Sequence, residues 1–167
     1  LVKDGPLTPE LDNIIEQWSN RLKNIIKVIF LENNVGLGNA LGHGLRHCSY
    51  DIVARMDTDD ISLPKRFISQ INFLQDNDHI KVVGSHISEF KYDENITLST
   101  RLVPLSHDEI LSTAKFNNPF NHPSVMYRKS AILGVGGPVN FTGFDDYILW
   151  VKVLKRGFKC ANIDKVL

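Results

Sequence analysis

The chain has 167 residues, of which 43% are hydrophobic, so its length and composition fit one domain with a substantial core. Its 19 Lys and Arg residues balance 19 Asp and Glu residues, and this net charge of zero lacks the basic excess that is typical of nucleic-acid-binding proteins. No apolar run approaches the roughly 18 residues that a membrane-spanning helix needs.

Strand-like and helix-like patterns of apolar residues alternate along the chain. The first helix is predicted over residues 7–18, with Thr8 and Pro9 as its cap and first turn. Further helices are predicted over residues 36–47, 67–77, 110–116, 128–133 and 145–155, and strands over residues 25–31, 52–56, 80–83 and 125–127. Residues 91–101 resemble a hairpin or an irregular insertion. This order predicts an α/β fold with right-handed crossovers and a largely parallel sheet.

The two ends of the sequence suggest a longer domain. The sequence opens at Leu1 without an initiating Met, its first five residues resemble the end of a strand, and Val166 and Leu167 lie within an apolar run. We therefore expect one domain over residues 1–167 that is truncated at both ends and lacks at least a first strand–helix unit. Cys48 and Cys160 are far apart and are expected to be reduced, which suits a cytoplasmic protein.

The strand predicted at residues 52–56 ends in three carboxylates, Asp57, Asp59 and Asp60. Like charges at the end of a buried strand repel one another and lose hydration, and a hard divalent cation such as Mg²⁺ or Mn²⁺ removes that cost. Because ligands of open α/β sheets bind at the carboxyl ends of strands, Asp57 and Asp59 indicate a metal–diphosphate site. Asp60 or Ser62 could also cap the helix that follows, and one Asp can cap while two others hold metal.

Three other segments have both a structural and a functional interpretation. The glycine-rich residues 36–44 lack the third glycine of the dinucleotide fingerprint, so tight packing is the favoured role and phosphate contact the alternative. His43 and His47 lie one helical turn apart but have no evident third zinc ligand, which favours ordinary histidines. The polar loop over residues 117–124 either connects two elements or lines a site.

Two adjacent carboxylates, Asp145 and Asp146, stand at the start of the last predicted helix. Acidic residues favour helix amino termini because of the helix dipole, which is a sufficient structural explanation. A general base would occupy the same kind of place, close to a cleft and beside a second carboxylate that raises its pKa.

Four segments in this order carry a family resemblance: residues 34–38 (Asn-x-Gly-Leu-Gly), 54–60 (Ala-Arg-Met-Asp-Thr-Asp-Asp), 121–126 (Asn-His-Pro-Ser-Val-Met) and 144–150 (Phe-Asp-Asp-Tyr-x-x-Trp). Together they closely resemble the family 2 inverting glycosyltransferases, above all the bacterial members that build surface polysaccharides. The resemblance covers essentially the whole chain. It implies hexosyltransferase activity and the GT-A fold, a Rossmann-like three-layer sandwich with a mostly parallel central sheet.

The resemblance also implies roles for particular side chains. Asp146 matches the catalytic general base, which takes the proton of the acceptor hydroxyl in a single inverting displacement. Nucleotide-sugar binding is implied for five residues: Asp4, Asp57, Asp59, His122 and Asp145. Asp59 and Asp60 are the implied ligands of Mn²⁺ or Mg²⁺. Two positions depart from the family pattern, because Leu41 replaces a common Arg that contacts the diphosphate, and Asp145 replaces the commoner Glu.

The implied partners are a nucleotide-diphosphate sugar, with UDP as the favoured nucleotide, and a saccharide or lipid-linked acceptor. No nucleic-acid partner is expected. A lipid-linked acceptor would bring a cytoplasmic protein to the inner face of the cell membrane as a peripheral protein.

Two alternatives come from other functional classes. The first is a phosphohydrolase of the haloacid-dehalogenase type, whose Asp-x-Asp motif also follows a strand, although Ile61 and Ser62 fit its continuation poorly. The second is a non-catalytic GT-A module that binds a nucleotide sugar without transferring it.

Overall fold

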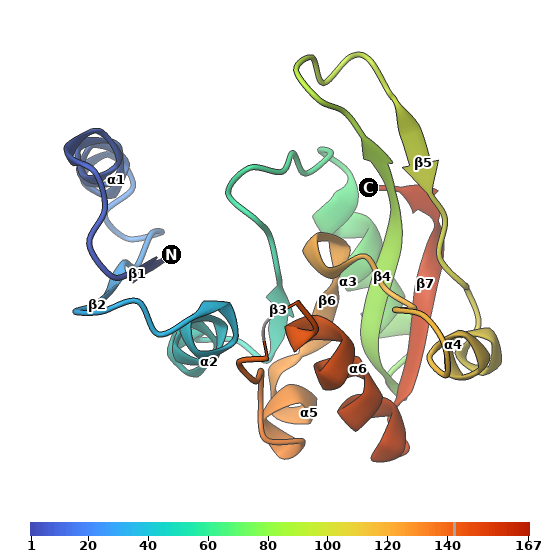
Figure 1. Ribbon diagram of the computed structural model, residues 1–167. Helices are drawn as coiled ribbons and strands as arrows, with labels where there is room; N and C mark the ends of the chain where they lie inside the picture. Colours follow the sequence, from blue (N-terminus) through green and yellow to red (C-terminus); the bar gives the residue numbers. More distant parts are fainter. Residues whose placement is uncertain (142) are drawn as a thin grey trace. The chain divides into compact units, whose positions relative to one another are not determined.

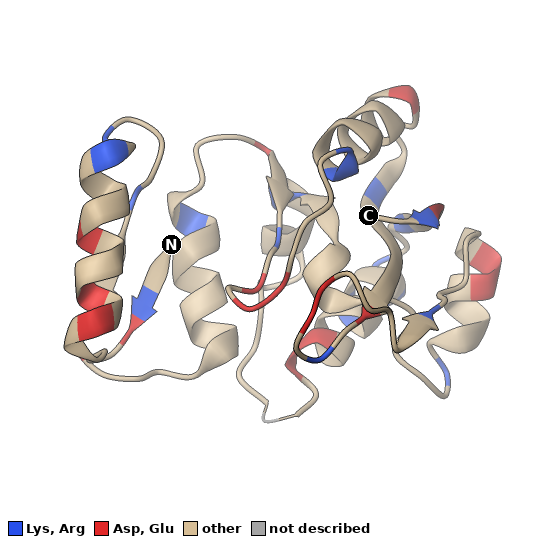
Figure 2. Ribbon diagram, turned by 90° about the horizontal axis from the view of Figure 1, so that it is seen from above, with Lys and Arg blue, Asp and Glu red and all other residues tan. Residues whose placement is uncertain are grey.

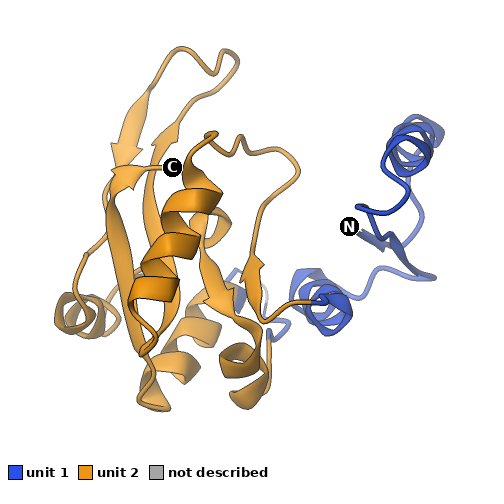
Figure 3. Ribbon diagram, turned by 180° about the vertical axis from the view of Figure 1, so that it is seen from behind, with its two compact units in different colours: residues 1–49, 138–145 blue, residues 50–137, 146–167 orange. Residues whose placement is uncertain are grey.

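The computed structural model describes residues 1–141 and 143–167, and these form two compact units. Unit 1 comprises residues 1–49 and 138–145, and unit 2 comprises residues 50–137 and 146–167 (Figure 3). Basic and acidic residues are interspersed along the ribbon of both units (Figure 2), in keeping with the balanced charge of the sequence.

Unit 1 contains a strand–helix–strand crossover. Strands β1 (Val2–Asp4) and β2 (Ile29–Leu31) pair in parallel and are joined through helix α1 (Pro9–Arg21). The predicted start of α1 is confirmed, since the Thr8 side chain accepts a hydrogen bond from the Leu11 amide at 3.5 Å and Pro9 begins the helix.

Glycines allow helix α2 (Leu37–His47) to pack closely within unit 1. Gly36 precedes the helix with φ of 85°, a conformation that glycine adopts without a Cβ penalty. A Cβ atom on Gly38 would lie 1.9 Å from the Val139 carbonyl oxygen, so only glycine fits beside residues 138–140. The predicted close packing of this segment on a strand is confirmed at Gly44, where a Cβ atom would lie 3.0 Å from Val2 Cγ2 of β1, and the contact with residues 138–140 was not predicted.

Unit 2 is built on a five-stranded sheet, in which the strand order is β3–β6–β4 and both β5 and β7 pair with β4. The strands are β3 (Ile52–Ala54), β4 (Ile80–Glu89), β5 (Ser99–Arg101), β6 (Met126–Arg128) and β7 (Lys159–Val166). Parallel pairing joins β4 to β7, whereas β6 is antiparallel to both β3 and β4, and β5 is antiparallel to β4.

The expectation of a mostly parallel sheet is therefore corrected to a mixed sheet. Strands β3, β4 and β7 share one direction, because β3 and β4 both oppose β6 and β7 runs with β4. The short connection over residues 90–98 turns β5 back along β4 as a hairpin, since a connection of this length allows only antiparallel pairing. The hairpin alternative for residues 91–101 is thus confirmed.

Helices cover both faces of this sheet. Helix α6 (Asp145–Lys155) lies in front of the sheet in Figure 1, and α3 (Arg66–Asp76) lies in front of it in the opposite view of Figure 3. Val82 and Val83, which neighbour each other on β4 and point to opposite faces, are both fully buried. The shorter elements are α4 (His107–Thr113), the 3₁₀ helix η1 (His122–Ser124) and α5 (Lys129–Gly134).

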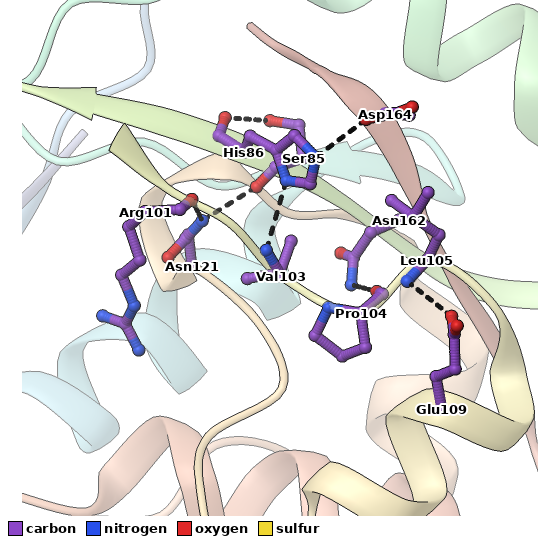
Figure 4. Close-up of polar contacts among 10 residues, drawn as sticks. All are labelled: Ser85, His86, Arg101, Val103, Pro104, Leu105, Glu109, Asn121, Asn162 and Asp164. Carbon is purple, nitrogen blue, oxygen red and sulfur yellow. Dashed lines mark hydrogen bonds and ion pairs between the residues drawn. The ribbon is translucent and has the colours of Figure 1, made fainter. Parts of the chain in front are cut away.

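Buried polar side chains hold the segment between β5 and α4 (Figure 4). They come from β4, from the loop before η1 and from β7, and they bond to backbone atoms of residues 101–105. The Val103 amide donates to His86 Nδ1 (3.2 Å), Asn121 Nδ2 donates to the Arg101 carbonyl (3.3 Å), and Asn162 Nδ2 donates to the Pro104 carbonyl (2.6 Å). This segment is therefore fixed by specific hydrogen bonds rather than by apolar packing alone.

The two cysteines behave as predicted. Cys48 and Cys160 are thiols rather than halves of a disulfide, and burial raises the pKa of the Cys160 thiol to about 12, which makes it unreactive. Within residues 1–141 and 143–167, no helix has the length and apolar character to cross a membrane.

Candidate functional site

The loop that follows β3 gathers three carboxylates. Asp57, Asp59 and Asp60 each offer an oxygen, and these oxygens lie within 4.8 Å of one another. The capping alternative for Asp60 and Ser62 is wrong, because α3 begins at Arg66 with Lys65 as its N-cap and no side chain caps it. Asp60 is therefore left with the other two carboxylates at the surface.

Two buried arginines lie beneath this acidic loop. Arg55 forms an ion pair with Asp57 and is itself 6% exposed. Arg66 donates hydrogen bonds to the carbonyls of Arg55 (2.6 Å) and Val125 (3.3 Å), and burial followed by the charge of Arg55 lowers its pKa. Arg55 therefore gives Asp57 a buried ion-pair partner, and Arg66 fixes the backbone that leads into the acidic loop.

Asp60 lies among like charges in the acidic loop. Burial raises the pKa of Asp60, and the charges of Asp57 and Asp59 raise it further. Oxygen donors in a crowded anionic group suit a hard divalent cation, which would relieve this repulsion. Asp59 and Asp60 are the two members for which no protein ion pair is found among the described residues, so the residues present fit Mg²⁺ or Mn²⁺.

A second carboxylate site lies at the start of α6. Asp146 Oδ1 accepts a hydrogen bond from the Tyr147 amide at 2.8 Å, and Asp146 Oδ2 accepts one from Asn118 Nδ2 at 2.5 Å. His122 Nδ1 lies 4.0 Å from the same Oδ2 atom. The Asp146 side chain is 23% exposed, so it is held by the protein yet accessible to a bound molecule.

The remaining predicted residues, Asp4 and Asp145, both belong to unit 1. Asp4 stands at the end of β1 and accepts a hydrogen bond from the Val35 amide at 2.8 Å, which joins it to the loop before α2. Asp145 Oδ1 accepts from the Phe141 amide at 2.5 Å. Asp145 therefore stabilises a local turn, whereas the Asp4 contact joins two segments that lie 31 residues apart.

A cavity of about 400 Å³ opens beside the acidic loop. It is lined by Asp60 and Arg66, by apolar side chains of the same loop such as Ile61, and by residues of the β4–β5 hairpin that include Phe90 and Asn95. This cavity could not be predicted from the sequence, because its walls come from segments that are far apart in the chain: the acidic loop, the β4–β5 hairpin and the end of β7. His43 and His47 belong to no group of three metal-binding side chains within the described part of the chain.

The chain was compared with known proteins. Residues 1–135 match the family model described as Glycosyl transferase family 2. The amylovoran biosynthesis glycosyltransferase AmsE of Erwinia amylovora is 38% identical over 167 residues, which are 100% of this chain and 61% of that protein. The UDP-Gal:alpha-D-GlcNAc-diphosphoundecaprenol beta-1,3-galactosyltransferase of Escherichia coli is also 38% identical over 167 residues, 100% of this chain and 60% of that protein.

Solved structures share the fold at much lower identity. The mannosyltransferase PcManGT from Pyrobaculum calidifontis, solved in complex with GDP-Man and Mn²⁺, superposes with a TM-score of 0.70 at 14% identity, covering 99% of this chain and 45% of that chain. The chain spans about 60% of the length of the two curated relatives that it matches.

Proposed function

Because the chain belongs to glycosyltransferase family 2, we propose that the complete protein is an inverting hexosyltransferase. It transfers a sugar from a nucleotide-diphosphate donor to a saccharide or lipid-linked acceptor in bacterial polysaccharide synthesis. The single observation that carries this proposal is the pair of carboxylate sites in unit 2, an acidic loop after β3 and a separately held Asp146 at the start of α6.

The donor is a nucleotide-diphosphate sugar, with UDP as the favoured nucleotide. In this proposal Asp4 contacts the base and Asp57 the ribose side, while Asp59 faces the diphosphate. His122 and Asp145 complete the donor site. The ion pair of Asp57 with Arg55 supports this division, because it directs one carboxylate away from the cation and leaves Asp59 and Asp60 to hold it.

When Mn²⁺ or Mg²⁺ is bound at Asp59 and Asp60, it supplies Lewis-acid stabilisation of the charge on the leaving diphosphate. The protein's own contribution is the proton transfer. Asp146 takes the proton of the acceptor hydroxyl as that oxygen attacks the anomeric carbon from the side opposite the diphosphate. One positioned carboxylate is sufficient for a single displacement, so no covalent nucleophile is needed.

The lipid-linked acceptor is proposed from the diphosphoundecaprenol acceptor in the name of the Escherichia coli relative. Such an acceptor would place the protein at the inner face of the cell membrane as a peripheral protein. The Asp60 cavity, which has apolar and polar walls, lies on the same side of unit 2 as the acidic loop and is available for part of a bound substrate.

The Asp146→Asn substitution in the complete protein tests the proposal. We expect turnover to fall by about 10²- to 10⁴-fold, because the amide cannot accept the proton, while calorimetry with UDP and Mn²⁺ gives an unchanged affinity. Turnover is followed as UDP release from UDP-galactose, UDP-glucose and UDP-N-acetylglucosamine, with a short-chain alkyl diphosphate of N-acetylglucosamine as acceptor.

Asp108→Asn is the matched control, since Asp108 occupies the first turn of α4 as Asp146 does in α6 and is exposed. It should transfer at the wild-type rate. Near-normal turnover in Asp146→Asn would remove Asp146 from the role of base.

A further inference from the structure

The amide of Asn118 has a defined orientation in the loop before η1. Its Oδ1 atom accepts a hydrogen bond from the Phe120 amide at 3.2 Å, so the other end of the side chain must be the Nδ2 donor. That donor lies 2.5 Å from Asp146 Oδ2. The Asn118 side chain therefore links its own loop to the first turn of α6 through two hydrogen bonds.

The Asn118 side chain donates a hydrogen bond to one carboxylate oxygen of Asp146, and the backbone of α6 donates one to the other. Asp146 Oδ1 accepts from the Tyr147 amide at 2.8 Å, and the Tyr147 hydroxyl donates to the Ala114 carbonyl at 2.7 Å. His122 Nδ1, 4.0 Å from Oδ2, is beyond hydrogen-bonding distance of the carboxylate. The Asn118 amide is thus a side-chain donor at hydrogen-bonding distance from Asp146, and it comes from a segment 28 residues earlier in the chain.

The loop and the helix are also packed as one body. Phe120, which is 1% exposed, lies 5.2 Å from the ring of Trp150 on α6, and the His122 ring meets the same indole edge-on at 5.7 Å. Pro119 further restricts the backbone between Asn118 and Phe120. The distance from Asn118 to Asp146 is therefore set by a rigid core contact and does not depend on a mobile loop.

We propose that Asn118 is the positioning residue of the transfer reaction, which fixes the Asp146 carboxylate in the orientation that faces the acceptor hydroxyl. This inference rests on the proposed role of Asp146 as base. A general base acts only from within hydrogen-bonding reach of the proton that it removes, so a side chain that fixes its rotamer controls the rate without touching the substrate.

The Asn118→Asp substitution separates this role from a structural one. The new carboxylate has the same shape and can still accept the hydrogen bond from the Phe120 amide, but it no longer donates to Asp146 and places a like charge beside it. The other titratable side chains near Asp146 are His122 of η1 and the adjacent Asp145 and Tyr147, and all three are unchanged. Asn117→Asp is the control, because it adds the same charge one residue earlier at an exposed position.

The readout is the titration of the Asp146 carboxyl carbon by NMR in the complete protein, assigned by difference from Asp146→Asn. We expect Asn118→Asp to raise the midpoint of this titration by about one pH unit or more, with the acidic limb of the kcat profile moving in the same direction. Asn117→Asp should leave both unchanged. Asn118→Ala, which removes the donor without adding charge, should lower kcat about 10-fold while the affinity for UDP and Mn²⁺ stays the same.

An equal titration midpoint in Asn118→Asp and Asn117→Asp, or a wild-type kcat in Asn118→Ala, would overturn the inference. Its failure is distinct from a failure of the proposed function. If Asp146→Asn keeps its turnover, the base has been assigned wrongly whatever Asn118 does; if Asp146→Asn is inactive and the Asn118 variants behave as wild type, only the positioning role is lost.

Discussion

Asp60 shows how burial and neighbouring charges act on a single side chain of the acidic loop. Burial and the charges of Asp57 and Asp59 raise its pKa, so the folded protein binds a proton at Asp60 more readily than the unfolded chain does. The stabilising contribution of this group is complete below its unfolded pKa and is lost as the pH rises through the raised folded pKa. At neutral pH the ionised Asp60 therefore opposes folding until a cation compensates its charge.

This argument predicts opposite effects of Asp60→Asn with and without metal. In metal-free buffer at pH 7, we expect the variant to melt about 1–2 °C above the wild type, because one repulsive charge is gone. With UDP and Mn²⁺ at about 100 times the dissociation constant, the wild type should gain about 2.7 kcal/mol and the variant clearly less. Equal stabilisation of both proteins by Mn²⁺ would show that Asp60 is not a ligand, and Asp108→Asn serves as the control for a change in surface charge.

At the level of single residues, sequence analysis predicted the acidic side chains of the candidate site but not the side chains that hold them in place. Asp57, Asp59, Asp60 and Asp146 could be named as candidates because carboxylates at the ends of strands and the starts of helices have a limited set of uses, and their roles stay predictions. Asn118 could not, since its contact with Asp146 spans 28 residues and depends on the packing of Phe120 against Trp150. The polar loop over residues 117–124 was singled out as a possible site wall, which is the signal that could have found it.

Among the secondary-structure elements, local signals predicted the helices well and the strands less well. The predicted range of α6 agrees with the observed Asp145–Lys155, and α1 starts where Thr8 and Pro9 indicate. Strand β4 was predicted to end at Val83 but continues to Glu89, through Gly84, Ser85 and His86. These residues lack apolar alternation, and their buried polar groups are satisfied by distant side chains such as Ser124, which receives a hydrogen bond from the Ser85 amide at 3.1 Å.

Strand β7 was not predicted for a related reason. Its buried face includes Asn162, whose Nδ2 donates to the carbonyls of Pro104 (2.6 Å) and Pro119 (3.2 Å). A buried asparagine breaks the hydrophobic pattern that sequence analysis depends on. Its hydrogen-bond partners, which lie 58 and 43 residues away, become known only from the folded chain.

Helix α2 offers a matched test of close packing in unit 1. Gly38→Ala should destabilise the protein by more than about 2 kcal/mol, because the added methyl group would overlap the Val139 carbonyl. Gly42→Ala on the same helix meets only the flexible Arg46 side chain at 3.8 Å and should stabilise by about 0.5–1 kcal/mol through helix propensity. Urea unfolding measures both, and a neutral Gly38→Ala would show that residues 138–140 do not pack on α2 as described.

At the scale of the whole molecule, the order of four short motifs was sufficient to predict both the family and the GT-A fold. The family match over residues 1–135 and the superposition on PcManGT at a TM-score of 0.70 confirm these predictions. The direction of the strands followed less directly from sequence, because alternation of strands and helices does not reveal where β5 and β6 reverse. The extent of the domain stays a prediction, since the chain spans about 60% of its curated relatives.

In the proposed function the acidic loop of unit 2 binds the diphosphate through a cation, because the diphosphate and the carboxylates of Asp59 and Asp60 would otherwise repel one another.

Isothermal calorimetry of the complete protein with UDP, GDP and dTDP, each with and without Mn²⁺, tests the central claim most directly. The account predicts that one nucleotide, UDP, binds in the presence of Mn²⁺, that removal of Mn²⁺ abolishes most of this affinity, and that Asp59→Ala reproduces the metal-free result. Equal affinity with and without Mn²⁺, or an unchanged affinity in Asp59→Ala, would contradict it.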